Sequence, residues 1–218
     1  AAILLAVLTY HGLFIGTVLG FVASALLVGS VVLPGPRPDT GGSLYKRTTR
    51  GLHIYLATPR LRGLLALSLA AAAAGAMVLV NTIVLVRGVL GLGEPQVAVA
   101  LGFFGGGSML AALILPRLLD RLSDRTVMMY GATILPVVLL ALALVLEIDR
   151  LVWGTLLGAW VAIGIGYSAV LTPSGRLLRR STHAEDRPAV FAAQFALSHA
   201  CWLVTYPLAG WVITTSGP

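Results

Sequence analysis

The sequence predicts an all-α protein that crosses a membrane several times, and its composition and hydropathy pattern are the observations that predict it. Hydrophobic residues make up 58% of the 218 positions and charged residues only 11%, whereas an ordinary soluble domain carries about a quarter charged residues. Apolar stretches of about 20 residues recur along the chain, and each is long enough to cross a hydrocarbon core as a helix. Because so few charges cannot cover a water-facing surface, we expect lipid to surround most of the protein.

Other classes of protein fit these observations less well. The alternating hydropathy of a membrane β-barrel is absent. The net charge of +7 could indicate nucleic acid binding, but the basic residues lie in short connections between apolar stretches and not along one soluble face. The single cysteine, Cys201, cannot form an intrachain disulfide. The sequence has no GxxxxGK[ST] motif and no metal-ligand spacing, so we expect no local ATP hydrolysis, no cofactor, no metal and no nucleic acid partner.

Six complete membrane spans and one partial span are predicted from the apolar stretches. The complete spans are Leu13 to Leu33, Leu64 to Val86, Val97 to Leu115, Val127 to Leu146, Leu151 to Leu171 and Val190 to Thr214. Tyr10, His11 and Gly12 are expected to form a polar, aromatic break, with Ala1 to Thr9 as the tail of a truncated helix. Because the chain begins inside an apolar run without a Met, we expect it to be a fragment of a longer protein.

The distribution of basic residues predicts the orientation of these spans. If the spans alternate in direction, one side of the membrane receives thirteen of the fifteen Lys and Arg residues, and the other receives only Arg87 and Arg150. Such a bias places the basic side in the cytoplasm. The high ratio of Arg to Lys is typical of a bacterium with a GC-rich genome, so the cytoplasmic (inner) membrane of a bacterium is the expected location.

A cytoplasmic linker then divides the chain into three parts. Residues 1–33 would hold the end of one helix and one complete helix of a first bundle. Residues 34–62 form the linker, which opens with a Pro- and Gly-rich stretch. Residues 63–218 would hold five spans of a second bundle, whose last helix is expected to be missing.

The second half of the linker carries apolar side chains among basic ones. The apolar members are Tyr45, Leu52, Tyr55 and Leu56, and the basic members are Lys46, Arg47 and Arg50. This pattern predicts a short helix on the inner membrane surface, where anionic headgroups attract the basic side chains. An unstructured basic linker is the alternative.

Three stretches carry a resemblance to a known family. Gly51 to Leu65 (GLHIYLATPRLRGLL) joins the linker to an apolar span, Pro116 to Thr126 (PRLLDRLSDRT) is a short charged loop, and Thr172 to Gln194 is a basic connection followed by a helix with small and polar residues. Taken with the topology, they resemble the major facilitator superfamily, whose twelve helices form two six-helix bundles joined by a long cytoplasmic loop. On this alignment the chain covers the end of the fifth helix through the eleventh.

The charged loop is similar to the family's cytoplasmic signature of Gly, an apolar pair, Asp, Arg, any residue, Gly and then basic residues. Asp120, Arg121 and Arg125 match this signature. The resemblance implies that the aspartate helps to stabilise one access state, while both arginines also fit plain topology determinants. Pro116 and Ser123 stand where the family usually has Gly, and Asp124 stands where a basic residue is common. We therefore expect that the contacts by which this loop stabilises one access state in the family are weaker in this chain.

The resemblance also implies a substrate cavity between the two bundles, lined in this half by the seventh, eighth, tenth and eleventh helices. The candidate cavity residues are Asn81, Tyr167, Gln194, Ser198, His199 and Thr205. In the eleventh helix Gln194, Ser198, Cys201 and Thr205 share one face, and Phe195, His199, Trp202 and Tyr206 form the neighbouring stripe. These side chains could present hydrogen bonds and an aromatic wall to a ligand. Alternatively, the small polar residues hold helices together and the aromatic residues face lipid.

Two candidates have a more specific chemistry. His199 is the only clearly ionisable group within a complete span, and with an ordinary pKa near 6.5 it could carry protons, although a neutral, hydrogen-bonded histidine also fits. Asn81 is the only side-chain amide in its span. Because an unpaired amide in lipid is costly, we expect Asn81 to face either the cavity or another helix.

The leading hypothesis is a secondary transporter of small molecules, coupled to protons and acting as an exporter. No fixed charge in these spans requires a strongly charged substrate. A non-transporting membrane scaffold or sensor is the alternative, and substrate-dependent transport separates the two. An intramembrane enzyme that uses His199 and Cys201 is disfavoured, because residues two apart in a helix point about 200° from each other.

Overall fold

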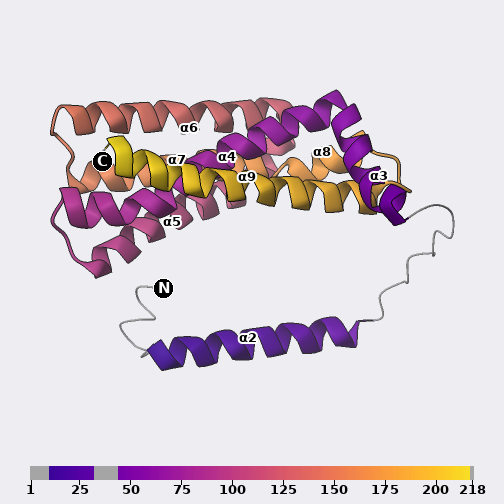
Figure 1. The fold of residues 1–218 in the computed structure, drawn as a ribbon, viewed down its shortest axis with the longest axis horizontal. Helices are drawn as coiled ribbons and strands as arrows, with labels where there is room; N and C mark the ends of the chain where they lie inside the picture. The colour runs from indigo at the N-terminus through magenta and orange to yellow at the C-terminus, as the bar shows by residue number, and fades with distance from the viewer. Residues whose placement is uncertain (1–9, 32–43, 217–218) are drawn as a thin grey trace. The chain divides into compact units, whose positions relative to one another are not determined.

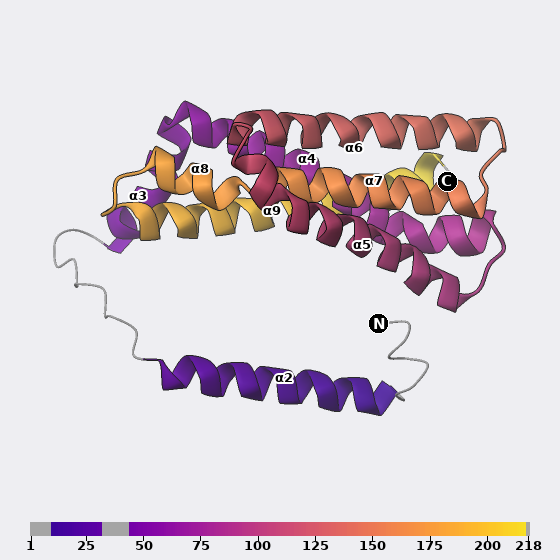
Figure 2. The same ribbon diagram turned by 180° about the vertical axis from the view of Figure 1, so that it is seen from behind.

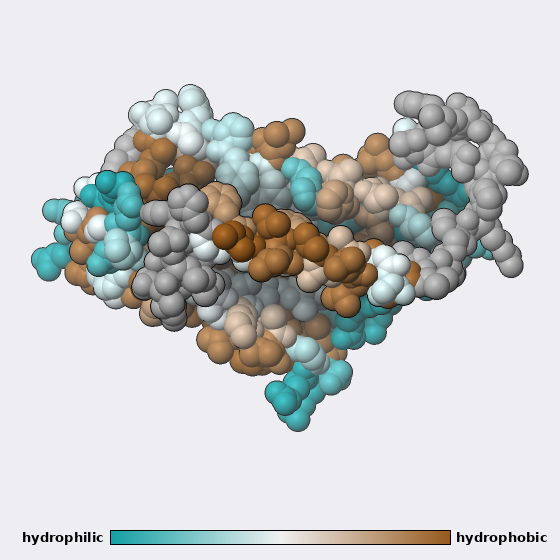
Figure 3. All heavy atoms as spheres, turned by 90° about the horizontal axis from the view of Figure 1, so that it is seen from below, coloured by the Kyte–Doolittle hydropathy of each residue, from teal (hydrophilic) through white to brown (hydrophobic). Residues whose placement is uncertain are grey.

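The computed structural model describes residues 10–31 and 44–216, and the chain divides into two compact units, Ala1–Ser43 and Leu44–Pro218. The described part of the first unit is the helix α2, Tyr10–Ser30 (Figure 1). Its side chains are mostly apolar, as Figure 3 shows. Tyr10, His11 and Gly12, which were expected to form a break before the helix, are its first three residues. The partial span expected before Tyr10, and the Pro- and Gly-rich stretch of the linker, lie outside the described residues.

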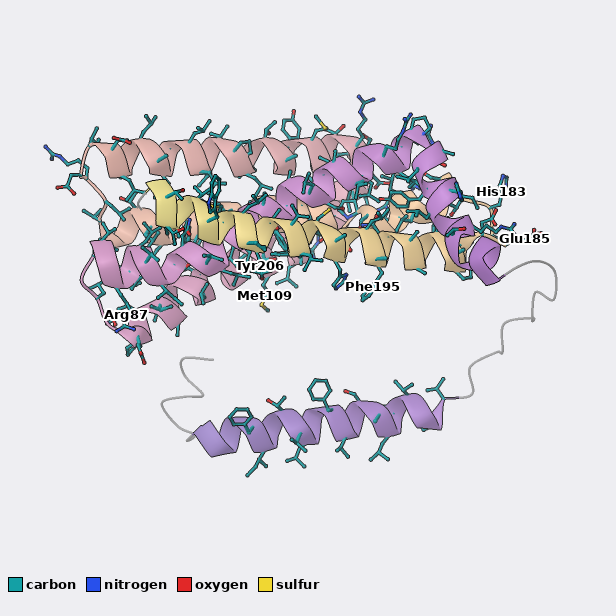
Figure 4. The ribbon with its side chains drawn as sticks, in the orientation of Figure 1. Arg87, Met109, His183, Glu185, Phe195 and Tyr206 are labelled. Carbon is teal, nitrogen blue, oxygen red and sulfur yellow. The ribbon has the colours of Figure 1, made fainter. Side chains whose placement is uncertain are left out.

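The second unit is a bundle of helices that run alternately in opposite directions (Figures 1 and 2). Its elements are α3 (Leu44–Ala57), α4 (Pro59–Ile83), the π-helix η1 (Val84–Val89), α5 (Glu94–Leu119), α6 (Asp124–Glu147), α7 (Trp153–Leu171), α8 (Ser174–Ser181) and α9 (Arg187–Ser216). The described residues contain no strand. Arg87 lies at one end of the bundle, whereas His183 and Glu185 lie at the other (Figure 4).

Five helices of the described part are long and apolar enough to cross a membrane. They are Pro59–Val89, Glu94–Leu119, Asp124–Glu147, Trp153–Ser181 and Arg187–Thr215. Each corresponds to one of the predicted spans from Leu64 onward, so the predicted all-α class and the order of these spans are confirmed. The sequence pattern did not indicate α8, a short helix with a strongly basic face inside the connection that follows α7.

The helix α4 lies at the centre of the bundle and contacts α3, η1 and each of α5 to α9. Small side chains allow this position, because Ala71, Ala72 and Ala74 are each 1% exposed and Gly75 lies directly against the Trp202 ring. A Cβ atom on Gly75 would lie 2.4 Å from that ring. The bulkiest core side chain, Trp160 of α7, is 1% exposed and belongs to the main hydrophobic cluster shared by α4, α5, α6 and α7.

The helices α5 and α7 pack backbone against backbone. A Cβ atom added at Gly107 would lie 2.2 Å from the carbonyl oxygen of Val161, and one added at Gly164 would lie 2.1 Å from the carbonyl oxygen of Phe104. Atoms cannot approach so closely, so only glycine permits this contact, as is common where helices associate in lipid. The three other glycines of this part of α5, Gly102, Gly105 and Gly106, have nothing within 4 Å of a built Cβ atom.

The predicted linker helix forms as α3, and it packs against α9 and α4. Thr58 separates α3 from α4, and Pro59, which lacks a backbone N–H, suits the first turn of the next helix. Gly51 lies against the backbone of Ala189 in α9, where a Cβ atom would lie 2.0 Å from the carbonyl oxygen. The expectation that Tyr55 faces the membrane surface is wrong, because α9 and α4 bury this side chain completely.

The helix α3 also carries an ion pair and two exposed leucines. The Arg50 guanidinium lies 2.8 Å from the Asp186 carboxylate, just before α9 begins. Leu52 and Leu56 remain 36% and 43% exposed. The helix therefore has one face on the bundle and a second, apolar face that is free to meet lipid headgroups and acyl chains.

Replacing Gly107 tests the contact between α5 and α7. We expect Gly107→Ala to destabilise the protein by about 1–3 kcal/mol, because the added methyl group must push the helices apart. The matched control is Gly105→Ala, which gains a methyl group in open space and should leave stability unchanged or raise it slightly. Thermal unfolding of the purified protein, followed by tryptophan fluorescence, measures both. A Gly107→Ala variant that melts at or above the wild-type temperature would contradict this packing.

Candidate functional site

A cavity of about 380 Å³ lies between α4, α7, α8 and α9. Its lining residues are Ser68, Ala71, Ala72, Tyr167, Leu171, Ser174, Gly175, Leu178, Phe191, Gln194, Phe195, Ser198 and Trp202. None of these side chains carries a charge. The cavity combines apolar walls with a few hydrogen-bonding groups, which is the usual composition of a site for an uncharged small molecule.

Gln194 lies at the centre of the polar groups of this cavity. Its Nε2 donates a hydrogen bond to the Ser68 hydroxyl at 3.3 Å, and its Oε1 accepts one from the Tyr55 hydroxyl. The three side chains come from α9, α4 and α3, so one amide joins three helices. The cavity therefore touches a residue that is directly bonded to the linker helix.

The Tyr55 hydroxyl is protonated, and this protonation state favours its hydrogen bond to Gln194. Burial, and to a smaller extent the nearby Cys201 side chain, raises the pKa of Tyr55 far above its usual value of 10.0. The hydroxyl consequently stays protonated at any physiological pH and remains a donor to Gln194. The sequence pattern identified Gln194 but placed Tyr55 at the membrane surface, because nothing in the local sequence indicates a partner 139 positions away.

Aromatic rings also line the cavity. The Tyr167 ring meets Phe104 edge-on with a centroid distance of 5.7 Å and meets Trp202 at 6.3 Å. Trp202 in turn lies 5.1 Å from Tyr206. Tyr167 and Trp202 line the cavity, whereas Phe104 and Tyr206 extend the same row of rings beyond it. The aromatic wall expected from the sequence thus includes a residue of α7 as well as residues of α9.

The remaining candidates of α9 occupy different environments. Ser198 lines the cavity and donates a hydrogen bond to the Phe195 carbonyl at 3.0 Å. Thr205 is buried and donates to the Trp202 carbonyl at 3.4 Å, so it bonds its own helix. His199 is exposed, and its Nδ1 lies 2.7 Å from the Phe195 carbonyl, an acceptor to which only a protonated ring nitrogen can donate.

One side of α9 is exposed together with a neighbouring stretch of α5. Phe195 and Tyr206 of α9 lie on the same side of the bundle as Met109 of α5 (Figure 4). Phe195 is 66% exposed and Met109 is 65% exposed. His199 stacks on Phe195 with a centroid distance of 4.0 Å and belongs to this exposed side. Because Phe195 also lines the cavity, the exposed side and the cavity share a wall.

Asn81 lies in a different cavity from Gln194. It lines a hollow near the other end of α4 and is 9% exposed. Its Nδ2 reaches only the Met77 sulfur, at 3.5 Å, and its Oδ1 has no hydrogen-bond partner among the described residues. The structure therefore does not bring Asn81 together with the other cavity candidates.

The charged loop between α5 and α6 uses a different aspartate from the one that the family signature indicates. Asp124, at the start of α6, is 6% exposed and lies 2.8 Å from Arg180 and 3.4 Å from Arg176 of α8. The contact with Arg180 is a hydrogen bond. Ser123 caps the same helix by accepting a hydrogen bond from the Thr126 amide at 3.1 Å. The contacts of Asp124 hold α8 against the start of α6.

The residues that match the family signature are exposed. Asp120 directly follows α5 and Arg121 comes next, and neither makes an ion pair with a described residue. Arg125 is also exposed and lines a shallow groove along α6 with Tyr130. These three side chains can contact another part of the chain, including one that reaches them only in a different conformation.

Comparison with known protein families decides what this bundle is. The sequence model of the Major Facilitator Superfamily matches residues 65–218, about seven tenths of the chain. The chain belongs to the major facilitator superfamily. The resemblance to this family is therefore confirmed over residues 65–218. This major facilitator is a multi-pass membrane protein of a transporter family, and neither the curated proteins nor the solved structures contain a match to it.

Neutralising Asp124 and Asp120 separately distinguishes their roles in this major facilitator. We expect Asp124→Asn to lower stability by about 1–2 kcal/mol, because it weakens a charged hydrogen bond whose arginine is partly exposed. Asp120→Asn, a matched change at an exposed position, should alter stability by less than about 0.5 kcal/mol. Thermal unfolding of both purified variants measures the difference. Equal melting temperatures would show that the contacts of Asp124 do not stabilise this end of the bundle.

Proposed function

We propose that the protein is a secondary transporter that carries an uncharged, partly aromatic or amphipathic small molecule through the cavity at Gln194 by alternating access. The observation that carries the proposal is the composition of that cavity. Its hydrogen-bonding groups come from α4, α7, α8 and α9 and its rings lie on α7 and α9, while its lining holds no charge. A charged substrate would need an opposite charge in the lining of the site.

The packing of the helices supports a cavity that changes shape. Buried alanines and Gly75 of α4 let neighbouring helices approach closely, and we propose that the helices slide along these contacts. Gln194 is bonded to Tyr55 of α3 and to Ser68 of α4, so a movement at the cavity would also change the contact with the linker helix. The position of the linker helix α3 would therefore change when the cavity rearranges.

The finer parts of the proposal are proton coupling and export. His199 is the residue that we assign to proton coupling, because its imidazole is exposed and stacks on Phe195, which lines the cavity. Histidine is the side chain that most often transfers protons near neutral pH. We also propose that Asp120, with Arg121 and Arg125, makes its contacts in one access state only, which agrees with the exposure of these side chains.

Transport assays with two glutamine variants test the proposal. Cells that express the intact protein would be loaded with a panel of labelled uncharged aromatic and amphipathic compounds, and efflux would be measured with and without a proton uncoupler. We expect uncoupler-sensitive efflux of at least one compound. Gln194→Leu should reduce it about tenfold, the effect of losing one or two hydrogen bonds. Gln96→Leu, the same change outside the cavity, should leave it near the wild-type rate.

The same assay separates the finer parts from the transport function itself. His199→Gln should lower efflux that is driven by the proton gradient while leaving passive exchange of the compound intact. Movement that ignores the uncoupler would contradict proton coupling but not transport. Absence of movement across the whole panel would instead favour a scaffold or sensor, and the cavity at Gln194 would then have a structural role.

A further inference from the structure

The Gln194 amide has two neighbours, and one of them lies outside the cavity. The Tyr55 hydroxyl donates to the amide Oε1, and the amide Nε2 donates to the Ser68 hydroxyl at 3.3 Å. Ser68 belongs to the lining of the cavity, whereas Tyr55 is completely buried and does not. The oxygen end of the amide therefore lies beside a residue outside the cavity, and the nitrogen end lies beside a residue of its lining.

Tyr55 determines this orientation of the amide. The two ends of a glutamine amide have nearly the same shape, so only hydrogen bonds distinguish one orientation from its reverse. The Ser68 hydroxyl fits both, because a serine can accept from an N–H group or donate to a carbonyl. The buried Tyr55 hydroxyl has no other hydrogen bond among the described residues, so a reversed amide would leave it without an acceptor. An unsatisfied buried donor is costly, and the reversed orientation is disfavoured.

Two features keep Tyr55 in the role of donor. A phenolate would accept from the NH₂ group and reverse the amide, but burial raises the pKa of Tyr55 and the phenolate does not form at physiological pH. The backbone of α3 is held against α9, where Gly51 lies against Ala189 and the Arg50 guanidinium lies 2.8 Å from the Asp186 carboxylate. The orientation of the amide is therefore a consequence of how the linker helix packs on α9.

The fixed amide presents a donor to the cavity. An amide nitrogen carries two N–H groups, and the bond to Ser68 uses one of them. The second N–H group of Gln194 makes no hydrogen bond with a described residue and is available to a ligand. A ligand that brings a carbonyl to this point gains a hydrogen bond, whereas one that brings an N–H or O–H group places two donors against each other.

We propose that Tyr55 is a positioning residue that makes the Gln194 amide a hydrogen-bond donor to the substrate, and that the substrate is an uncharged molecule with a carbonyl or similar acceptor at this point. The inference rests on the transport function proposed for this cavity and narrows its substrate class. It also assigns part of the substrate selection to the linker helix, which lies outside the lining of the cavity.

The affinities of three bicyclic probes test the proposal, measured by calorimetric titration of the intact protein in lipid nanodiscs. 1-Indanone carries an acceptor, indole carries an N–H donor, and indene carries neither. Titration of empty nanodiscs supplies the correction for partition into lipid. We expect the wild type to bind 1-indanone about tenfold more tightly than indole or indene, and Gln194→Leu to bring the three affinities to within about threefold.

Two variants that each remove one hydroxyl from Gln194 isolate the role of Tyr55. Tyr55→Phe keeps the ring but lets the amide take either orientation, so the preference for 1-indanone over indole should fall to about threefold or less. Ser68→Ala is the matched control, because Tyr55 still bonds Oε1 and the preference should stay near its wild-type value. Ser174 and Ser198 donate to main-chain carbonyls in every variant, so the difference reports the amide alone. A merely structural role of Tyr55 would weaken all three probes alike.

Equal affinity of the wild type for 1-indanone and indole would overturn the proposal, as would the absence of saturable 1-indanone binding. A preference that survives in Tyr55→Phe would overturn the role of Tyr55. These failures are distinct from a failure of transport, because the efflux panel measures movement of any compound. Efflux that depends on Gln194 without a preference for acceptors would contradict only this inference, whereas acceptor-selective binding without efflux would contradict only transport.

Discussion

The close approach of α4 to its neighbours is the constraint on which the bundle depends. In a bilayer, the apolar side chains gain nothing by leaving water, so helices associate through van der Waals contact and hydrogen bonds between them. α4 meets this requirement with Ala71, Ala72, Ala74 and Gly75, which let α9 and α7 approach its backbone. Two polar residues of α4, Ser68 and Asn81, each line a cavity.

The two cavities follow from this arrangement and differ in chemistry. At Gln194 the polar groups are bonded to one another, so a ligand must exchange hydrogen bonds with a network that already joins α3, α4 and α9. At Asn81 the amide oxygen is unsatisfied within the described part of the chain. The first cavity is the one through which we propose that a substrate passes.

The spans were predictable from the sequence because the bilayer demands about 20 apolar residues for each crossing, whatever the tertiary contacts. The helix α3 was predictable for a similar reason, but not the burial of Tyr55, since its partner Gln194 lies on a helix far along the chain. The loop signature indicated Asp120, whereas the paired carboxylate is Asp124. That contact requires α8, whose position depends on how the chain turns after α7. Helical spacing grouped His199 with Trp202, yet only packing against α4 determines that Trp202 is half-buried while His199 is exposed.

The central claim is that the cavity at Gln194 forms part of the substrate pathway, and the accessibility of Ser198 tests it most directly. Ser198→Cys would be labelled with a membrane-impermeant thiol reagent, from each side of the membrane in turn, in a protein with Cys201 and any other cysteine replaced. The account predicts labelling from both sides, slowed by a transported compound. Labelling from neither side, or labelling that no transported compound affects, would contradict it.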